Sequence, residues 1–169
     1  MKFTTLILLC ITAASSGAAL QDASEWFGRG LNAFNDGRYA ESVTLYTKAI
    51  ELDSAAAPAW YNRAAAYIRL KQFDKAHHDL DRCMKIFPGA TNVKMQRAIV
   101  RSELGRYAEA LDDVNTVIRG DTTFPKARLL RGRILLAVYK DTVRACHDFR
   151  ATLALGDSAA MRYVQGVCR

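Results

Sequence analysis

Residues 57–90 read APAWYNRAAAYIRLKQFDKAHHDLDRCMKIFPGA. Apolar and small side chains recur every three or four residues in both halves of this stretch: Trp60, Ala64 and Tyr67, then Ala76, Leu80 and Cys83. This spacing predicts two helices, joined by a short polar turn at Lys71-Gln72. Pro88-Gly89 then ends the second helix. The stretch therefore predicts a helical hairpin.

The same pattern recurs along the chain with a period of 34 residues. The clearest column is an arginine followed by a very small residue: Arg29-Gly30, Arg63-Ala64, Arg97-Ala98 and Arg131-Gly132. Large residues form further columns at Tyr39, Phe73 and Tyr107, and at Tyr46, Leu80 and Val114. In the fourth unit the later columns reappear one residue late, at Ala145, Phe149 and Thr152, which predicts a one-residue insertion near 139–142.

Trp60-x-x-Arg63-Ala64-x-x-Tyr67, followed by Ala76-x-x-x-Leu80 and Pro88, resembles the tetratricopeptide repeat family. The resemblance implies an all-α fold, an α-solenoid of four helical hairpins at residues 23–56, 57–90, 91–124 and 125–157. One hairpin cannot bury its apolar face alone, so the four are expected to stack. Residues 158–169, with Asp157 as N-cap and Met161, Val164 and Cys168 on one face, are predicted to form a C-terminal capping helix.

The first twenty residues have a different character from the repeats. One charge at Lys2 precedes an uncharged, mostly apolar run from Phe3 to Ala14, and small residues follow at positions 15–19. This layout predicts a signal peptide at residues 1–20, cleaved after Ala19 or, as second choice, after Gly17. We therefore expect an exported protein, periplasmic or secreted. A lipoprotein site at Cys10 is disfavoured because Leu9 stands where such a site needs a small residue.

Cleavage would leave three cysteines, in a compartment that permits disulfides. Cys146 and Cys168 lie symmetrically about residue 157, the turn between the last repeat helix and the cap. In an antiparallel pair of helices this symmetry places them level with each other, so we predict a disulfide between them. Cys83 stands in a column of small residues and is expected to be a buried, inert thiol. Whether it pairs between chains is left open.

An arginine is costly to bury without a partner. In the last three units an aspartate follows on the second helix, which predicts the ion pairs Arg63–Asp79, Arg97–Asp113 and Arg131–Asp148. The first unit has Leu45 at that place, so Arg29 must find another partner.

No catalytic residue, metal site or cofactor site is predicted. The sequence has no Cys-x-x-Cys, His-Glu-x-x-His, phosphate-binding glycine loop or Gly-x-Ser-x-Gly. His77, His78 and His147 are expected to be solvated surface residues. A non-catalytic scaffold is therefore expected, with an enzyme of unrecognised site as an alternative.

The resemblance implies that the first helix of each hairpin lines a concave face that binds a peptide or helix of another protein. By column, the expected lining is Phe27, Leu31, Phe34, Tyr61, Asn62, Ala65, Arg69, Met95, Gln96, Ile99, Leu129 and Arg133. Among these, Phe27, Tyr61 and Met95 are the favoured contacts, because aromatics and methionine suit binding surfaces. The aliphatics could instead pack between helices.

The family's clamp for a chaperone's C-terminal carboxylate needs Lys and Asn. This chain has Phe27, Leu31, Tyr61 and Ala65 at those places, so we expect an apolar peptide rather than that ligand.

Charge is unevenly distributed. Residues 125–169 hold nine basic and three acidic side chains, whereas residues 21–124 hold 14 of each. The alternative function is therefore an envelope adaptor that binds anionic lipid or polymer through the basic last repeat. Nucleic acid is not expected as a partner, because export separates the protein from it and no aromatic-basic motif is present. The sequence does not identify the partner, the pathway or the oligomeric state.

Overall fold

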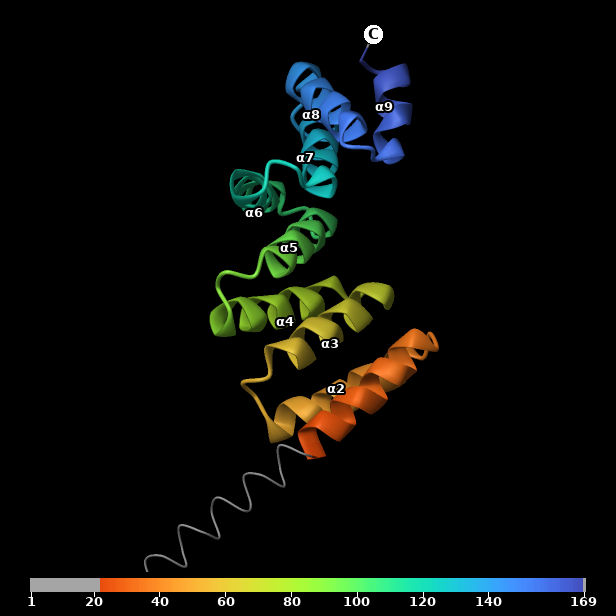
Figure 1. Cartoon of the computed structure of the whole chain (residues 1–169), viewed down its shortest axis with the longest axis vertical. Coiled ribbons are helices and arrows are strands. Elements are labelled where there is room, and N and C mark those ends of the chain that lie inside the picture. The colour runs from red at the N-terminus through yellow and green to blue at the C-terminus, as the bar shows by residue number, and fades with distance from the viewer. Residues whose placement is uncertain (1–21, 169) are drawn as a thin grey trace, which may run out of the picture. The chain divides into compact units, whose positions relative to one another are not determined.

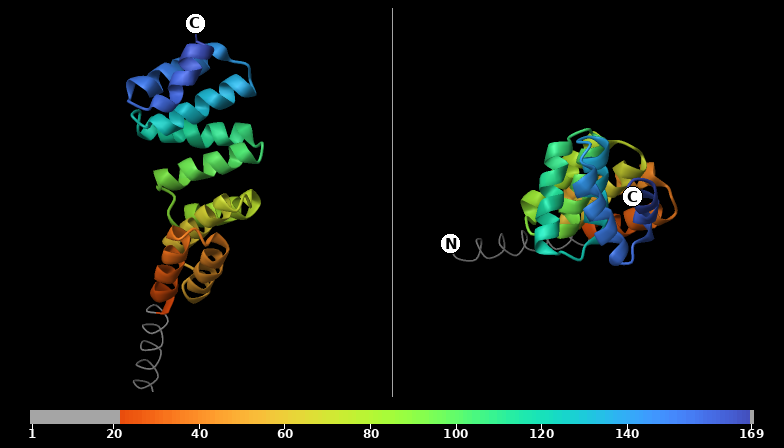
Figure 2. Two further views of the ribbon diagram at one scale, coloured as in Figure 1. Left: turned by 90° about the vertical axis from the view of Figure 1, so that its right-hand side faces the viewer. Right: turned by 90° about the horizontal axis from the view of Figure 1, so that it is seen from above.

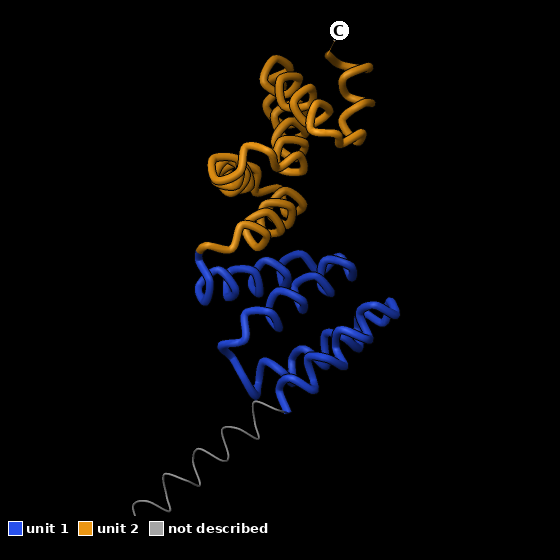
Figure 3. Tube along the Cα trace, viewed as in Figure 1, with its two compact units in different colours: residues 1–88 blue, residues 89–169 orange. Residues whose placement is uncertain are grey.

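The computed structural model describes residues 22–168, so the predicted signal peptide lies outside the described residues. The chain divides into two compact units, the first ending at Pro88 and the second beginning at Gly89 (Figure 3). Helices and turns make up the described part of the chain, and no strand occurs within residues 22–168.

The first unit contains two antiparallel helical hairpins (Figure 1). Hairpin 1 pairs a helix at residues 22–35 with α2 (Tyr39–Leu52), and hairpin 2 pairs α3 (Ala57–Arg69) with α4 (Phe73–Ile86). Pro58 is in the first turn of α3, where its missing N–H breaks no helical hydrogen bond.

The second unit contains two more hairpins and a C-terminal cap (Figure 2). Hairpin 3 consists of α5 (Thr91–Glu103) and α6 (Tyr107–Gly120), and hairpin 4 of α7 (Pro125–Ala137) and α8 (Thr142–Ala154). The cap is a short 3-10 turn, η1 (Ser158–Ala160), followed by α9 (Met161–Gly166). The expected all-α, solenoid-type fold class is confirmed within each unit.

Each turn inside a hairpin contains one residue with a left-handed backbone. Gly37 and Gly105 supply it with φ of +78° and +74°, whereas Lys71 adopts it with φ of 57° despite its side chain. In hairpin 4 this residue is Lys140, one position later than the period requires. The backbone N–H of Asp141 correspondingly reaches back six residues to Leu135 O. This confirms the predicted insertion.

Residue size is matched across the two helices of a hairpin. A Cβ atom added at Gly30 would lie 2.7 Å from the ring of Tyr46, and one added at Gly132 would lie 2.7 Å from the ring of Phe149. Both rings are fully buried. Hairpins 2 and 3 have alanine at the glycine position and an aliphatic residue at the aromatic one, so close helix contact is retained with different side chains.

The three predicted ion pairs are confirmed as bidentate contacts. Nε and Nη2 of Arg63 donate to Asp79 at 2.7 and 2.8 Å, Arg97 does the same to Asp113 at 2.9 and 2.8 Å, and Arg131 to Asp148 at 2.7 Å for both. All three carboxylates are buried. Hydrogen bonds to Asp148 raise the pKa of Arg131, so this guanidinium is charged at neutral pH.

The remaining nitrogen of the guanidinium reaches the preceding hairpin. Nη1 of Arg63 donates to Thr47 Oγ1 of α2 at 2.9 Å, and Nη1 of Arg131 donates to Asn115 Oδ1 of α6 at 2.8 Å. One arginine therefore joins three helices in each unit.

Arg29 has no aspartate and uses an aromatic face instead. Its guanidinium carbon lies 4.3 Å from the centre of the Trp26 ring, and Lys48 Nζ lies 4.2 Å from the same centre. This supplies the partner that the sequence required.

The cap differs in part from its prediction. Asp157 is the N-cap, since its carboxylate accepts from Ala159 N at 3.0 Å. The helix itself is shorter than expected, and Met161 is 40% exposed rather than on the buried face. Cys168 is buried and Val164 is half-buried, as predicted, whereas Ala160 in the opening 3-10 turn is buried in place of Met161.

Gly30→Ala is expected to destabilise the protein by about 1–3 kcal/mol, because the buried Tyr46 ring cannot move away from the new methyl group. Gly28→Ala is the matched control on the same helix. A Cβ there meets nothing within 4 Å, so helix propensity should raise stability by up to about 1 kcal/mol. Thermal unfolding followed by circular dichroism measures both. Equal effects of the two substitutions would contradict the size matching.

Asp113→Ala is expected to cost about 3–5 kcal/mol of unfolding free energy, because it leaves the half-buried guanidinium of Arg97 without that carboxylate. Asp112→Ala, at the exposed neighbouring position, should change stability by no more than about 0.5 kcal/mol. Urea denaturation measures the difference, and an unchanged midpoint for Asp113→Ala would rule out a structural role for the pair.

Candidate peptide-binding surfaces

The first unit has a small apolar pocket, here called the N-terminal pocket, of about 210 Å³. Its walls come from the helix 22–35, the end of α2 and the start of α3, with Phe27, Ala49, Pro58 and Ala59 as the principal apolar contacts. Phe27 is half-buried and packs against the Tyr46 ring at 5.7 Å between centres. Its remaining surface is therefore held in a fixed position at the mouth of the pocket.

The other predicted residues of the first unit remain at least partly accessible. Leu31 and Arg69 are exposed, and Phe34, Tyr61, Asn62 and Ala65 are half-buried. Two of them already have partners. Asn62 donates to Pro58 O in its own helix at 2.8 Å, and Arg69 donates to Tyr39 Oη at 3.0 and 2.8 Å. Phe34 packs edge-on against the same tyrosine, so Phe34, Tyr39 and Arg69 form one ordered cluster.

Met95 is not available for binding, contrary to the sequence expectation. It is only 5% exposed and belongs to the core cluster of the second unit, with Ala98, Val114, Ala127 and Leu130 among its members. A flexible thioether fills the gap between α5, α6 and α7 there. Ile99 and Leu129 are half-buried and also pack against core clusters. These two aliphatic residues therefore pack between helices, which was the alternative to a role in ligand binding. Gln96 is half-buried.

Arg133, the last predicted residue, is exposed and lines the larger groove of the second unit. This groove, here called the cap groove, encloses about 490 Å³ between the end of α5, the start of α6, α7 and the cap. Its apolar lining includes the buried Leu130 and Ile134 and the more accessible Tyr107, Leu136, Val138 and Tyr163. The sequence prediction missed most of these residues.

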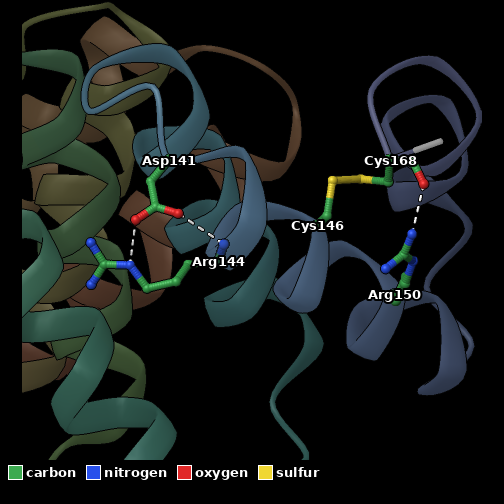
Figure 4. Close-up of a disulfide and its surroundings, with 5 residues drawn as sticks. All are labelled: Asp141, Arg144, Cys146, Arg150 and Cys168. Atoms are coloured by element: carbon green, nitrogen blue, oxygen red, sulfur yellow. Dashed lines mark hydrogen bonds and ion pairs between the residues drawn. A yellow bond between two sulfur atoms is a disulfide. The ribbon is translucent and has the colours of Figure 1, made fainter.

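The cap that carries Tyr163 is fixed to α8 by three contacts, and Figure 4 shows the two that involve Cys168. Cys146 and Cys168 form a disulfide with their Cα atoms 5.4 Å apart. Arg150 Nη2 donates to Cys168 O at 2.6 Å. The ring of Tyr163 stacks on Phe149 with centres 4.3 Å apart and planes at 12°.

A second groove of about 290 Å³, beside α6, α7 and α8, is polar. Its charged groups already have partners, since Arg131 binds Asp148 and Arg144 binds Asp141. The hydrogen bonds from Arg144 lower the pKa of Asp141, which also caps α8. We assign this groove a structural role.

Groups that could support chemistry are few among residues 22–168. Burial raises the pKa of the Cys83 thiol, which donates to Ala57 O at 3.5 Å, so it is a poor nucleophile. His78 and His147 are exposed as expected, but the His77 side chain is only 13% exposed, with Nδ1 lying 3.4 Å from Asp81. The described residues contain no cluster of three His, Cys, Asp or Glu suited to a metal, nor any helix that could span a membrane.

Two family models match the chain, "TPR repeat" at residues 32–71 and "Tetratricopeptide repeat" at residues 57–90. Residues 32–90 are therefore similar to tetratricopeptide repeats. Sperm-associated antigen 1 of Rattus norvegicus is 31% identical over 94 residues, which are 56% of this chain and 10% of that protein. The chain thus matches only about a tenth of this curated relative.

Two solved structures extend the likeness. The first TPR of Spaghetti (RPAP3), bound to the HSP90 peptide SRMEEVD, is 29% identical with a TM-score of 0.67, over 71% of this chain and 95% of that one. YrrB, described as a TPR protein with an unusual peptide-binding site, has a TM-score of 0.72 at 19% identity, over 92% of this chain and 82% of its own. The second likeness shows the fold alone, and it spans the hairpins of both units.

Thiol titration tests the disulfide and the predicted cleavage together. The chain isolated from its native host and denatured without reductant should show one reactive thiol, that of Cys83. Reduction before denaturation should raise the number to three, because the predicted cleavage removes Cys10. Two thiols before reduction would mean that the leader is retained, and three would mean that the bridge is absent.

Proposed function

We propose that this chain is an exported, non-catalytic scaffold that binds a peptide or helical segment of a partner protein. The observation that carries the proposal is the similarity of residues 32–90 to tetratricopeptide repeats, together with partly accessible aromatic side chains on the first helix of each hairpin in the first unit. A relative of similar sequence and fold binds a peptide, which supports the same class of activity here.

The N-terminal pocket and the neighbouring aromatics define the proposed surface of the first unit. Phe27 borders the pocket, and Tyr61 lies on α3 one helical turn after Pro58, another lining residue. Because these groups are apolar or aromatic, the favoured ligand buries a hydrophobic side chain. Asp53 is the only charged side chain in the pocket lining among the described residues, and it already accepts from Ala55 N at 3.0 Å.

A chaperone-type carboxylate clamp remains disfavoured for this surface. Phe27, Leu31, Tyr61 and Ala65 offer no ammonium or amide group for a terminal carboxylate, although relatives bind the HSP90 peptide SRMEEVD. The proposed ligand of the first unit therefore differs in chemistry from the ligand of those relatives.

Export is proposed on the charge, length and small-residue pattern of residues 1–20. The alternative function, binding of anionic lipid or polymer by the last repeat, is supported by the excess of basic side chains in residues 125–169. The two functions differ in salt dependence, because counter-ions screen exposed charges but not apolar contacts.

Selection from a random peptide library displayed on phage tests the proposed function. We expect enrichment of peptides with large apolar residues, and Tyr61→Ala should weaken their binding about tenfold. Phe87→Ala is the control, since it removes an exposed aromatic of the same unit that lies outside the pocket.

A library that yields no binders would contradict the proposal. Binding that is indifferent to Tyr61→Ala, falls steeply with salt and depends on Arg128 and Arg133 would favour the anionic-surface alternative instead.

A further inference from the structure

The cap groove contains a cation that has no carboxylate partner among the described residues. Arg133 is exposed on the groove wall, and it forms no ion pair with any residue in the described range 22–168. Glu103 also lines the groove but is not within ion-pair distance of it. The guanidinium is therefore available to a ligand.

All three acidic side chains of residues 125–169 already have partners. Asp141 accepts from Arg144 N at 2.9 Å, Asp148 binds Arg131, and Asp157 caps the 3-10 turn. The positive charge of the last repeat and cap is thus not neutralised from within that segment. A carboxylate from another molecule is the complementary group for Arg133.

The rest of the groove favours an apolar side chain. Apolar side chains, with Tyr107, Leu136 and Tyr163 among them, line a volume of about 490 Å³, which is large enough for an aliphatic residue together with part of its backbone. The occupant therefore needs an apolar and an acidic group close together, which an acidic peptide provides and a lipid headgroup alone does not.

One wall of the groove depends on the disulfide. Helix α9 has only six residues, too few to be stable in isolation. The bridge closes a loop with a sequence separation of 22 and ends at Cys168, five residues after Tyr163. Tyr163 therefore remains against Phe149, and at the groove, because the cap is tied at both ends.

We propose that the cap groove binds an acidic peptide segment in which a large aliphatic side chain stands beside a carboxylate, and that the Cys146–Cys168 disulfide positions the Tyr163 wall of this site. The inference rests on the proposed function and names the ligand chemistry of the second unit. Arg133 binds the carboxylate, and Tyr163 with Leu136 contacts the aliphatic group.

Three fluorescent peptides with blocked ends serve as probes for the oxidised full chain: GSELDIEGS, its basic counterpart GSKLKIKGS, and GSESDSEGS, which lacks the aliphatic residues. Fluorescence polarisation should show the first binding at least about tenfold more tightly than either of the others. Equal binding of the basic or serine peptide would overturn the inference.

Matched substitutions locate the site. Arg133→Glu should weaken binding of GSELDIEGS about tenfold, whereas Lys126→Glu, the same charge change at an exposed site on α7 outside the groove, should change it less than about twofold. Tyr163→Ala should weaken binding about fivefold, and Tyr139→Ala, at an exposed tyrosine outside the groove, should not. Equal losses within either pair would overturn the assignment.

The positioning role of the disulfide is tested by a double-mutant cycle. Replacing both Cys146 and Cys168 by Ala should weaken binding of GSELDIEGS about as much as Tyr163→Ala does. In a protein that already carries Tyr163→Ala, the cysteine replacements should cause no further loss of binding. A general loss of stability would instead make the two effects add, which would overturn the positioning role. Failure of GSELDIEGS to bind, alongside library peptides whose binding depends on Tyr61, would overturn this inference while leaving the proposed function intact.

Discussion

A planar guanidinium held by a buried aspartate stands between the helices of each of the last three hairpins. Two of its nitrogens bind the carboxylate within the hairpin, and in Arg63 and Arg131 the third reaches a side chain of the preceding hairpin. These bonds are directional, and the buried charges tolerate no loss of partner. The arginine guanidinium therefore fixes the orientation of helices within each unit, while the surrounding apolar contacts supply most of the stabilisation.

Much of this organisation could be predicted from the sequence, because repetition turns a local pattern into a spatial one. Once Arg63 and Asp79 were known to lie on facing helices, the same pairing followed for the equivalent residues of the next two hairpins. The displaced columns at Phe149 and Thr152 similarly identified the extra residue that the structure places before Asp141. The symmetry of Cys146 and Cys168 about the final turn suggested the pairing that the structure contains.

The sites could be predicted less well, because they depend on how side chains from distant segments pack together. Met95 belongs to the column of Phe27 and Tyr61, yet it fills the core where three helices of the second unit meet. Tyr163 was missed because the cap lies outside the repeat period. A signal did exist, since Phe149 and Tyr163 are nearly symmetric about the same turn as the cysteines. The cap begins with a 3-10 turn, which no residue pattern predicted, and Met161 is exposed contrary to the prediction.

The size matching at Gly30 and Tyr46 also limits how this molecule can diversify. The compensating residues lie on the two helices of one hairpin, so an exchanged whole hairpin carries both members of the pair with it. An exchange of single helices would instead place an alanine against an aromatic ring, which creates a clash, or a glycine against an aliphatic side chain, which leaves a void. Recombination between repeats is therefore expected to be tolerated at the loops between hairpins and selected against at the turns inside them.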